Sequence, residues 1–326
     1  MARLLVLPRP GMARKLRFTP EGGALFEVTC RTIHSRLLLR PSADFNELFL
    51  GALGRAQRKH PVEVCAVVCA SNHFHLLVRV HDSRQLALFM GYFLTKLSRE
   101  VSRLTGWTDT VFPRRYDAIL VSDEEGAQVA RLRYLLSHGA KENLVARPQD
   151  WPGVHCVQAL LTGEPLEGTW FSRTQEYNAR NRGEEVSPRQ FATTEIVELS
   201  PLPCWSHLSP EQHRARIAEI VESIIEEVEV RRRETGQEPL GTAAILAQDP
   251  FDQPIKTKKS PAPLVHAISK RVRKELYEAY AWFVAAFREA AEKLRAGDRM
   301  ARFPEGSFPP GLPFVGPPLP ALGPAG

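Results

Sequence analysis

Two histidines one residue apart, His73 and His75, form the first pattern in the sequence that could do chemistry. On a β-strand, residues i and i+2 point to the same face, so both imidazoles could bind one divalent cation while Phe74 points into the core. Imidazole suits zinc, manganese, iron or nickel, and with added oxygen ligands magnesium. The same spacing also fits two ordinary histidines on a solvent-facing strand, so the pattern alone leaves both interpretations open.

A second group of polar side chains shares one face of a helix predicted from Ser122 to His138. With about 100° per residue, His138 lies about 40° and Arg131 about 60° from Tyr134 around the helix axis. A tyrosine, a histidine and an arginine on one polar face could form the wall of an active site. The alternative is a boundary aromatic at Tyr134 and a histidine favoured by the helix dipole at position 138. The apolar residues fall on the opposite side of the helix, namely Val129, Leu132 and Leu136.

The elements that must position these residues follow from hydrophobic periodicity. Strands are predicted at 25–32, 62–70, 74–80 and 116–121, and helices at 43–59, 84–104 and 122–138. Ser71-Asn72 is a tight turn between the second and third strands. Ser122 and Glu125 have the spacing of a capping box, and Gly139 is a helix stop. The order β-α-β-β-α-β-α predicts an α+β domain with a ferredoxin-like antiparallel sheet and packed helices over residues 23–155.

The flanking regions differ in texture from this domain. Residues 1–22 are predicted to be a basic N-terminal arm with Arg14, Lys15 and Arg17. Residues 156–300 are expected to form a mostly helical extension, irregular over 155–208 and then helical over 210–234 and 262–296, with a basic loop at 256–259. Ser209 and Pro210 have the types expected at the N-cap and first helical position. Residues 301–326 are Pro/Gly-rich and predicted to be an extended tail.

Charge and composition limit the partners. The net charge is +6, and residues 1–155 contain 22 Lys and Arg against 14 Asp and Glu. A basic half predicts a polyanionic partner, nucleic acid before membrane, although a solvated basic face has the same composition. Five widely spaced cysteines contain no CxxC pair, which indicates reduced thiols. No apolar stretch approaches the ~18 residues needed to span a bilayer, so we expect a soluble cytoplasmic, nucleoid-associated protein without a membrane partner.

Taken together, these patterns resemble a known family. His73-Phe74-His75 is similar to the His-hydrophobic-His motif of the HUH single-strand nucleases, and its context SNHFHLL at 71–77 resembles the REP-associated tyrosine transposases, relatives of the single-tyrosine insertion-sequence transposases. The segments FPRRY at 112–116, RYLLSH at 133–138 and WP at 151–152 resemble further stretches of that family. The resemblance covers about residues 20–155, and its combination of motifs is specific although each motif alone is not.

The resemblance implies roles for individual residues. His73 and His75 are implied metal ligands and Tyr134 the nucleophile that forms a 5′-phosphotyrosine link. The family has an amide residue four positions after the tyrosine as the third ligand, and this chain has His138 there. The implied cofactor is a divalent cation, magnesium or manganese, with zinc as the alternative that a third imidazole favours. The implied activity is transposase-type nicking and joining of single-stranded or hairpin-forming repeat DNA, by a monomer or a homodimer.

Candidate DNA contacts are basic residues near these motifs. Arg131 shares the face of Tyr134, and Arg114 and Arg115 precede the last predicted strand. Lys96, Arg99 and Arg103 lie along one side of the long helix at 84–104. Each group could contact phosphates, and each is equally consistent with a solvated face. Trp107 and Phe112 could stack on unpaired bases, although core packing is the simpler interpretation.

Two other functions remain open at this point. A DNA-binding regulator derived from a transposase would have this fold and would bind DNA without cutting it. A metal-dependent hydrolase with its HxH pair on a barrel strand would need eight β/α units and further metal ligands on later strands.

Overall fold

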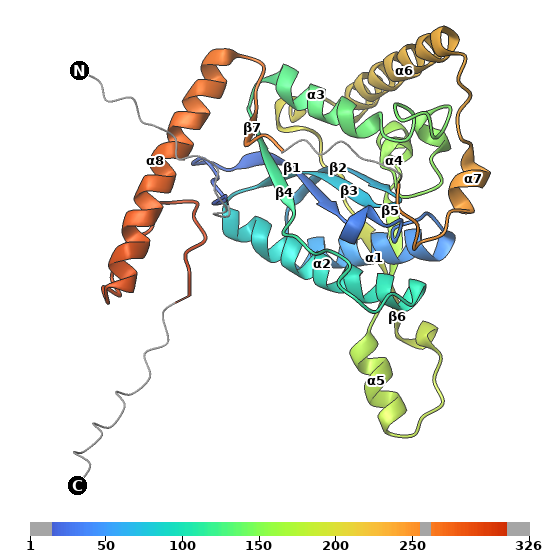
Figure 1. Ribbon diagram of the computed structural model, residues 1–326, viewed down its shortest axis with the longest axis horizontal. Coiled ribbons are helices and arrows are strands. Elements are labelled where there is room, and N and C mark those ends of the chain that lie inside the picture. Colours follow the sequence, from blue (N-terminus) through green and yellow to red (C-terminus); the bar gives the residue numbers. More distant parts are fainter. Residues whose placement is uncertain (1–14, 255–261, 312–326) are drawn as a thin grey trace.

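The computed structural model describes residues 15–254 and 262–311. Their main element is a five-stranded sheet with strand order β2-β3-β1-β4-β7. The predicted arm up to Arg14, the basic loop at 256–259 and the tail from residue 312 onward lie outside the described residues. Figure 1 shows this sheet at the centre of the molecule, with helices on both of its faces.

The sheet has the predicted ferredoxin-like arrangement. Its strands are β1 (Ala24–Arg31), β2 (Glu63–Ala70), β3 (His73–Val80), β4 (Asp117–Val121) and β7 (Val265–His266). β1 is antiparallel to both β3 and β4, and β2 is antiparallel to β3. The fold class predicted from the sequence is therefore confirmed, with one addition, the parallel strand β7 beside β4. Barrel strands of β/α units are absent from the described residues, which removes the barrel hydrolase.

Two helices, α1 (Ala43–Lys59) and α2 (Ser83–Thr105), cover the face of the sheet that holds the aromatic core. Both begin at a side-chain cap, because Ser42 accepts from the Phe45 amide and Asp82 from the Gln85 amide. Fully buried rings meet here, with the Phe74 centroid 5.7 Å from that of Phe49 and 5.4 Å from that of Phe93. Phe74 thus points into the core as predicted.

The opposite face is covered by α3 (Glu125–Leu136) and α6 (Pro210–Thr235). The capping box predicted at Ser122 is wrong, since α3 begins only after Glu124. The Ser122 amide instead donates to the carbonyl of His266 in β7, and its hydroxyl donates to the Glu124 carboxylate. A strand partner from far along the chain therefore replaces the local cap. At α6, Ser209 does form the predicted cap.

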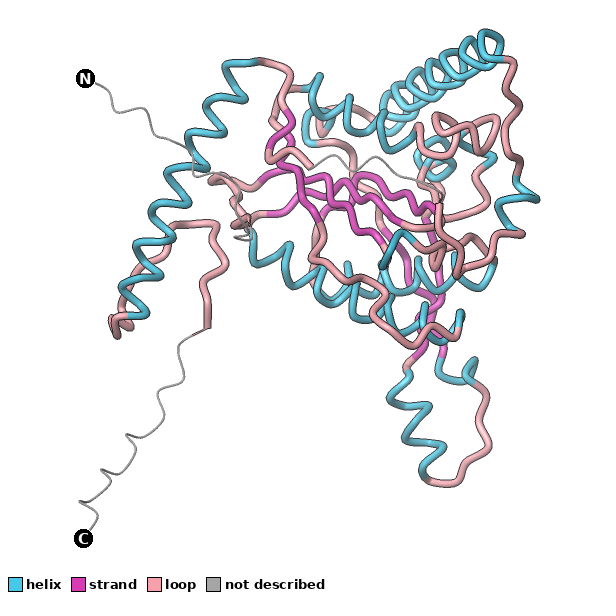
Figure 2. Tube along the Cα trace, in the orientation of Figure 1, coloured by secondary structure: helices cyan, strands magenta, loops and turns pink. Residues whose placement is uncertain are grey.

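Residues 155–208, predicted to be irregular, contain regular elements. They form α4 (Val157–Thr162), α5 (Arg173–Asn181) and a second two-stranded sheet of β5 (Leu166–Phe171) and β6 (Ala192–Val197). β5 approaches α1 backbone to backbone, because a Cβ on Gly51 or Gly168 would overlap main-chain atoms of the other element. Figure 2 shows α5 projecting away from the central sheet at the end of this hairpin.

The last part of the described chain returns to the sheet. The helix predicted over 262–296 is α8 (Lys270–Arg295), which begins later than expected because residues 264–266 pair with β4. α7 (Thr242–Leu246) and four short 3-10 helices, at Ile33–Ser35, Pro148–Asp150, Pro188–Phe191 and Pro203–Trp205, complete the elements. Residues 303–311 form no helix or strand. Across 15–254 and 262–311, no helix has the length and apolarity to cross a membrane.

Candidate active site

Three imidazoles converge on the face of the sheet opposite the aromatic core. His73 and His75 come from β3, and His138 comes from the turn that follows α3. One ligand nitrogen from each ring lies within 4.8 Å of the others. The ring centroid of His75 is 5.1 Å from that of His73 and 4.5 Å from that of His138. The structure therefore brings together the three residues that the sequence suggested as metal ligands.

The strand histidines are each oriented through one ring nitrogen. The His73 Nδ1 lies 2.6 Å from Oδ1 of Asn72, and the His75 Nδ1 lies 2.9 Å from Oε1 of Glu27 and 3.0 Å from the Thr29 hydroxyl. A carboxylate or amide oxygen accepts, so Nδ1 carries the proton in both rings. This leaves the Nε2 lone pairs free to bind a cation, an arrangement common among metal-binding histidines.

His138 is oriented in the same way by the main chain. Its Nδ1 lies 3.0 Å from the carbonyl oxygen of Tyr134, one helical turn earlier, and 3.4 Å from Nζ of Lys141. The carbonyl is nearer and can only accept, so Nδ1 donates to it and cannot also accept from the ammonium. All three histidines thus present Nε2 as the free nitrogen.

Burial keeps these imidazoles neutral. It lowers the pKa of His73 and of His138 well below the ordinary value, and the neighbouring imidazole of His75 adds to the effect on both. Burial also lowers the pKa of His75, against the opposing influence of Glu27. A neutral imidazole is the form that binds a metal, so the cluster is ready for a cation at neutral pH.

Tyr134 borders the cluster from α3 of the same chain. Its ring centroid is 5.6 Å from that of His75 and 4.9 Å from that of His138. The side chain is 37% exposed, so the phenol can be reached from outside. The pKa of Tyr134 is raised, first by burial and then by Glu27, against the opposing effect of Arg131. The residue is therefore protonated at neutral pH and accessible.

Two cations flank the ring of Tyr134. The Lys141 Nζ is 3.3 Å and the Arg131 Cζ 4.3 Å from its centroid. Arg131 also forms an ion pair with the buried carboxylate of Glu27, the group that holds His75. The predicted phosphate contact of Arg131 remains a prediction, because this guanidinium already has an internal partner. Glu27 links the histidine cluster to the surroundings of the tyrosine.

The other predicted DNA contacts lie apart from this cluster. Lys96, Arg99 and Arg103 are on α2, across the sheet from the histidines, and Arg103 pairs with Glu100. Arg114 and Arg115 are exposed before β4. Phe112 and Trp107 are half-buried, with ring partners Phe74 and Phe251 respectively. Both aromatics thus pack within the protein, as the simpler interpretation had it, while the role of the basic residues stays a prediction.

Several residues of the site were missed from the sequence. Glu27, Thr29 and Arg31 alternate along β1 toward the histidine face, and a glutamate inside an apolar strand was a usable signal. Lys141 follows the helix stop at Gly139, where no periodicity applies, so its place beside Tyr134 could not be foreseen.

The extension fixes the helix that carries Tyr134. The Glu124 carboxylate at the start of α3 accepts hydrogen bonds from the amides of Ile268 at 3.1 Å and Ser269 at 3.0 Å. Further along α3, Arg133 pairs with Glu227 of α6 at 2.6 Å. Tyr134 and the histidines are therefore assembled within one chain.

Comparisons with known proteins include two solved structures with partial similarity to this chain. No protein-family model and no curated protein matches the sequence. A solved REP-associated tyrosine transposase bound to a REP hairpin is 16% identical over 46% of this chain and 85% of that chain, with a TM-score of 0.36. A proposed transposase from Deinococcus radiodurans R1 is 13% identical over 37% of this chain and 94% of that chain, with a TM-score of 0.27. The first belongs to the family that the motifs resemble.

Proposed function

We propose that this chain is a metal-dependent enzyme that nicks and joins single-stranded DNA, with Tyr134 as the nucleophile. The observation that carries the proposal is the position of the Tyr134 ring, 4.9 Å and 5.6 Å from two of three converging imidazoles. A phenol beside a site of this kind, with Lys141 and Arg131 over its ring, has the parts needed for phosphoryl transfer. Arg131 opposes the rise in the pKa of Tyr134, and both cations favour the approach of a phosphate.

The histidine cluster fits a divalent cation. His73, His75 and His138 would hold it through three free Nε2 atoms whose other ring nitrogens are already hydrogen-bonded. A divalent cation bound there polarises the scissile phosphate and stabilises the charge that develops in the transition state. Since the three side-chain donors are all imidazoles, manganese or zinc suits the site better than magnesium.

The reaction exchanges one phosphodiester for another. The Tyr134 oxygen forms a bond to phosphorus, the bond from phosphorus to the 3′-oxygen breaks, and the phenolic proton ends on the released 3′-hydroxyl. The product is a 5′-phosphotyrosine link, which keeps the energy of the phosphodiester, so the attack of a 3′-hydroxyl reverses the step and joins two strands. The motif resemblance supports hairpin-forming repeat DNA as the substrate, and the basic charge of residues 1–155 agrees with it.

Trapping the covalent intermediate tests the proposal. A pool of hairpin oligonucleotides with randomised flanks, labelled at the 3′ end, is incubated with the full chain and analysed on denaturing gels. We expect a labelled protein band that needs a divalent cation and disappears with EDTA and in Tyr134→Phe. Tyr177→Phe is the matched control, because Tyr177 is an exposed tyrosine on α5 and should leave the band unchanged. A wild-type protein that binds the pool but never forms the band is a regulator, and the proposal is then wrong.

A further inference from the structure

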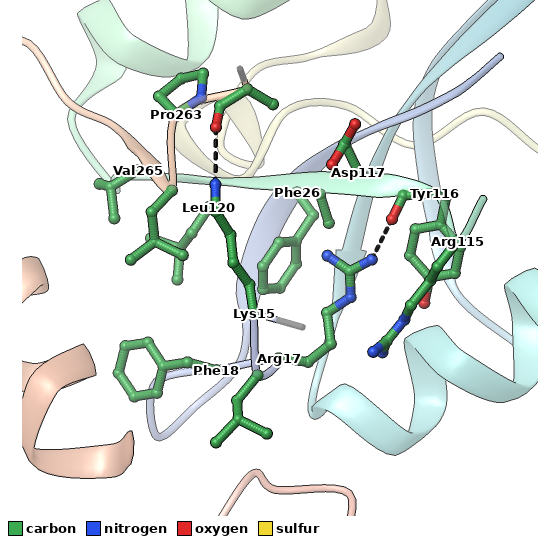
Figure 3. Close-up of a pocket in the computed structure, with 14 residues that line it drawn as sticks. Lys15, Arg17, Phe18, Phe26, Arg115, Tyr116, Asp117, Leu120, Pro263 and Val265 are labelled. Atoms are coloured by element: carbon green, nitrogen blue, oxygen red, sulfur yellow. Dashed lines mark hydrogen bonds between the residues drawn. The ribbon is translucent and has the colours of Figure 1, made fainter. Parts of the chain in front are cut away.

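A second cluster of positive charge lines a pocket on the other side of the sheet from Tyr134. The pocket, about 260 Å³ in volume, lies where residues 15–18, 115–118 and 262–265 meet beside β1. Phe26 and Leu120 line it and are paired across β1 and β4, whereas Glu27 and Ile119 of the next pair face the histidine side. Figure 3 shows Lys15, Arg17 and Arg115 around this space.

The pocket is lined by three cations and one carboxylate. Among the described residues, Lys15, Arg17 and Arg115 form no ion pair, and Asp117 is the single carboxylate in the lining. Arg17 donates to the carbonyl of Tyr116 and its guanidinium carbon lies 4.3 Å from the centre of that ring. Burial lowers the pKa of Arg17, which means that its charge is poorly solvated where it stands.

Elsewhere in the described residues, three buried carboxylates have arginine partners. Buried Glu27 is paired with Arg131, buried Glu100 with Arg173, and buried Glu195 with Arg55. Arg17 is half-buried and forms no ion pair, although the nearby Asp117 acts on it electrostatically. Desolvated charge of this kind is costly unless an opposite charge approaches it. The lining of the pocket therefore carries an excess of positive charge.

The segments outside the described residues contain basic but no acidic side chains. The residues outside the described part, 1–14, 255–261 and 312–326, include Arg3, Arg9, Arg14 and Lys256, Lys258, Lys259 but neither Asp nor Glu. Whatever their position, these segments cannot supply a side-chain carboxylate to Arg17. A phosphate of another molecule would supply an anion for these cations.

The other walls of the pocket indicate what that molecule is. Tyr116 is only 7% exposed. Its hydroxyl and the Nε of Arg17 are both buried, and neither has a hydrogen-bond partner among the described residues. Phe18, Phe26 and Leu264 add apolar surface opposite these polar atoms. The volume of about 260 Å³ lies near the lower end of the roughly 300–1,000 Å³ typical of small-molecule sites, which limits the ligand to a small one such as a single nucleotide.

We propose that this pocket binds one nucleotide, with its phosphate between Arg17, Arg115 and Lys15 and its sugar and base against Phe18 and Leu264. That a strand of DNA supplies the nucleotide rests on the function proposed above. The pocket then gives the strand a second contact, separated by the sheet from the tyrosine. A free nucleotide carries the same chemistry and is distinguished by experiment.

The test measures binding in the absence of cutting. Full-length Tyr134→Phe protein is titrated with a fluorescent hairpin oligonucleotide at several salt concentrations, alone and combined with Arg17→Gln or Arg115→Gln. Because hydrogen bonds to charged groups contribute about 1.5–3 kcal/mol, we expect Arg17→Gln to weaken binding about 10-fold or more. The slope of log K against log salt should fall by about 0.7 for one lost phosphate contact on a single strand. Arg216→Gln is the matched control, because Arg216 is a half-exposed arginine on α6 and does not line the pocket.

A second measurement separates the two sources of the nucleotide. If dAMP raises the Tm of the wild type but not of Arg17→Gln, the site accepts a free nucleotide; if only oligonucleotide binding changes, the nucleotide belongs to a strand. Equal stabilisation by inorganic phosphate and by dAMP overturns the assignment to a nucleotide. Oligonucleotide affinities of Arg17→Gln and Arg115→Gln equal to that of Arg216→Gln, without stabilisation by dAMP, overturn the site. Arg115 is exposed, so its replacement tests the site even if Arg17→Gln fails to fold. The covalent band of the wild type reports separately on the proposed function.

Discussion

The two faces of β3 have different tasks, although their residues alternate along one strand. Phe74 points to the face covered by α1 and α2, where its ring meets Phe49, Phe93 and Phe112. His73 and His75 point to the face under α3, where their neighbours are polar or charged. Period-two geometry places the aromatic core on one side of the backbone and the proposed reaction site on the other.

This difference predicts which property a substitution on each face should change. The aromatic face gains its stability from close packing, so loss of volume there should lower the free energy of unfolding. The histidine face contains the groups proposed to bind the cation, and Glu27 pairs there with both His75 and Arg131. Changes there should affect cation binding and strand cutting more than folding.

Loss of a ligand should have the largest effect. His75→Ala removes one of three converging imidazoles, and we expect the rate of covalent band formation to fall at least about 1,000-fold, because several kcal/mol of transition-state stabilisation are lost. The rate is measured with the 3′-labelled hairpin pool under saturating manganese. His207→Ala, at an exposed histidine, is the matched control. A His75→Ala enzyme that cuts at the wild-type rate would show that the cluster takes no part in the reaction.

Truncation on the aromatic face should have the largest effect on stability. Phe74 is fully buried, so Phe74→Ala should lower the free energy of unfolding by about 3–5 kcal/mol in urea titrations. Phe74→Leu, which retains most of the volume, should cost less. Under conditions where both variants are folded, their affinity for manganese should equal that of the wild type. A weakened affinity in folded Phe74→Leu contradicts the separation of the two faces.

The hydrogen bond from His75 to Glu27 should tune cation affinity. Glu27→Gln removes the carboxylate that orients this ring, and such outer partners typically contribute 10–100-fold, so we expect about that loss in Co²⁺ or Mn²⁺ affinity. Because the variant leaves Arg131 without its ion-pair partner, stability also falls. Glu27→Gln combined with Arg131→Gln should recover stability but not affinity. Recovery of both would mean that Glu27 acts only on folding.

The smallest expected effect concerns a buried histidine outside the site. Burial lowers the pKa of His155 to about 4, so the folded protein holds this ring neutral. Protonation then favours the unfolded chain, and stability falls as pH drops below the unfolded pKa of about 6.5 toward 4. Between pH 7 and pH 5 this group should cost about 2 kcal/mol. Urea titrations of the wild type and of His155→Asn at both pH values measure the difference, and equal pH dependence in the two proteins refutes it.

Local patterns predicted the core of the fold well. The helix at Ala43–Lys59 has its predicted ends because Ser42 caps it, an apolar stripe runs along it and Pro61 follows it. The failures have long-range causes. The spacing of Ser122 and Glu125 predicts a cap, yet the Ser122 amide donates to the carbonyl of His266, which is more than a hundred residues away. The strands at 166–171 and 192–197 escaped notice because a segment of twenty residues separates the two halves of the hairpin.

The candidate site was partly predictable for the same reason. His73 and His75 follow from strand periodicity, and His138 and Tyr134 from helix periodicity, so each pair was visible within one element. That the two pairs face each other came from the family resemblance, because no local rule states how α3 crosses β3. Lys141 lies beyond the helix end, and its contact with the Tyr134 ring depends on a turn whose path the sequence does not reveal.

The borders of the central sheet have a consequence for how the protein behaves at high concentration. On the β4 side, residues 264–266 occupy the main-chain groups of Leu120 and Ser122. On the β2 side, His155 and Leu199 bridge to Val68 and Val64. Open strand edges are templates on which chains add to one another, and here short segments of the same polypeptide have taken those places. The molecule should therefore resist fibril growth through this sheet, even though its strands are strongly apolar.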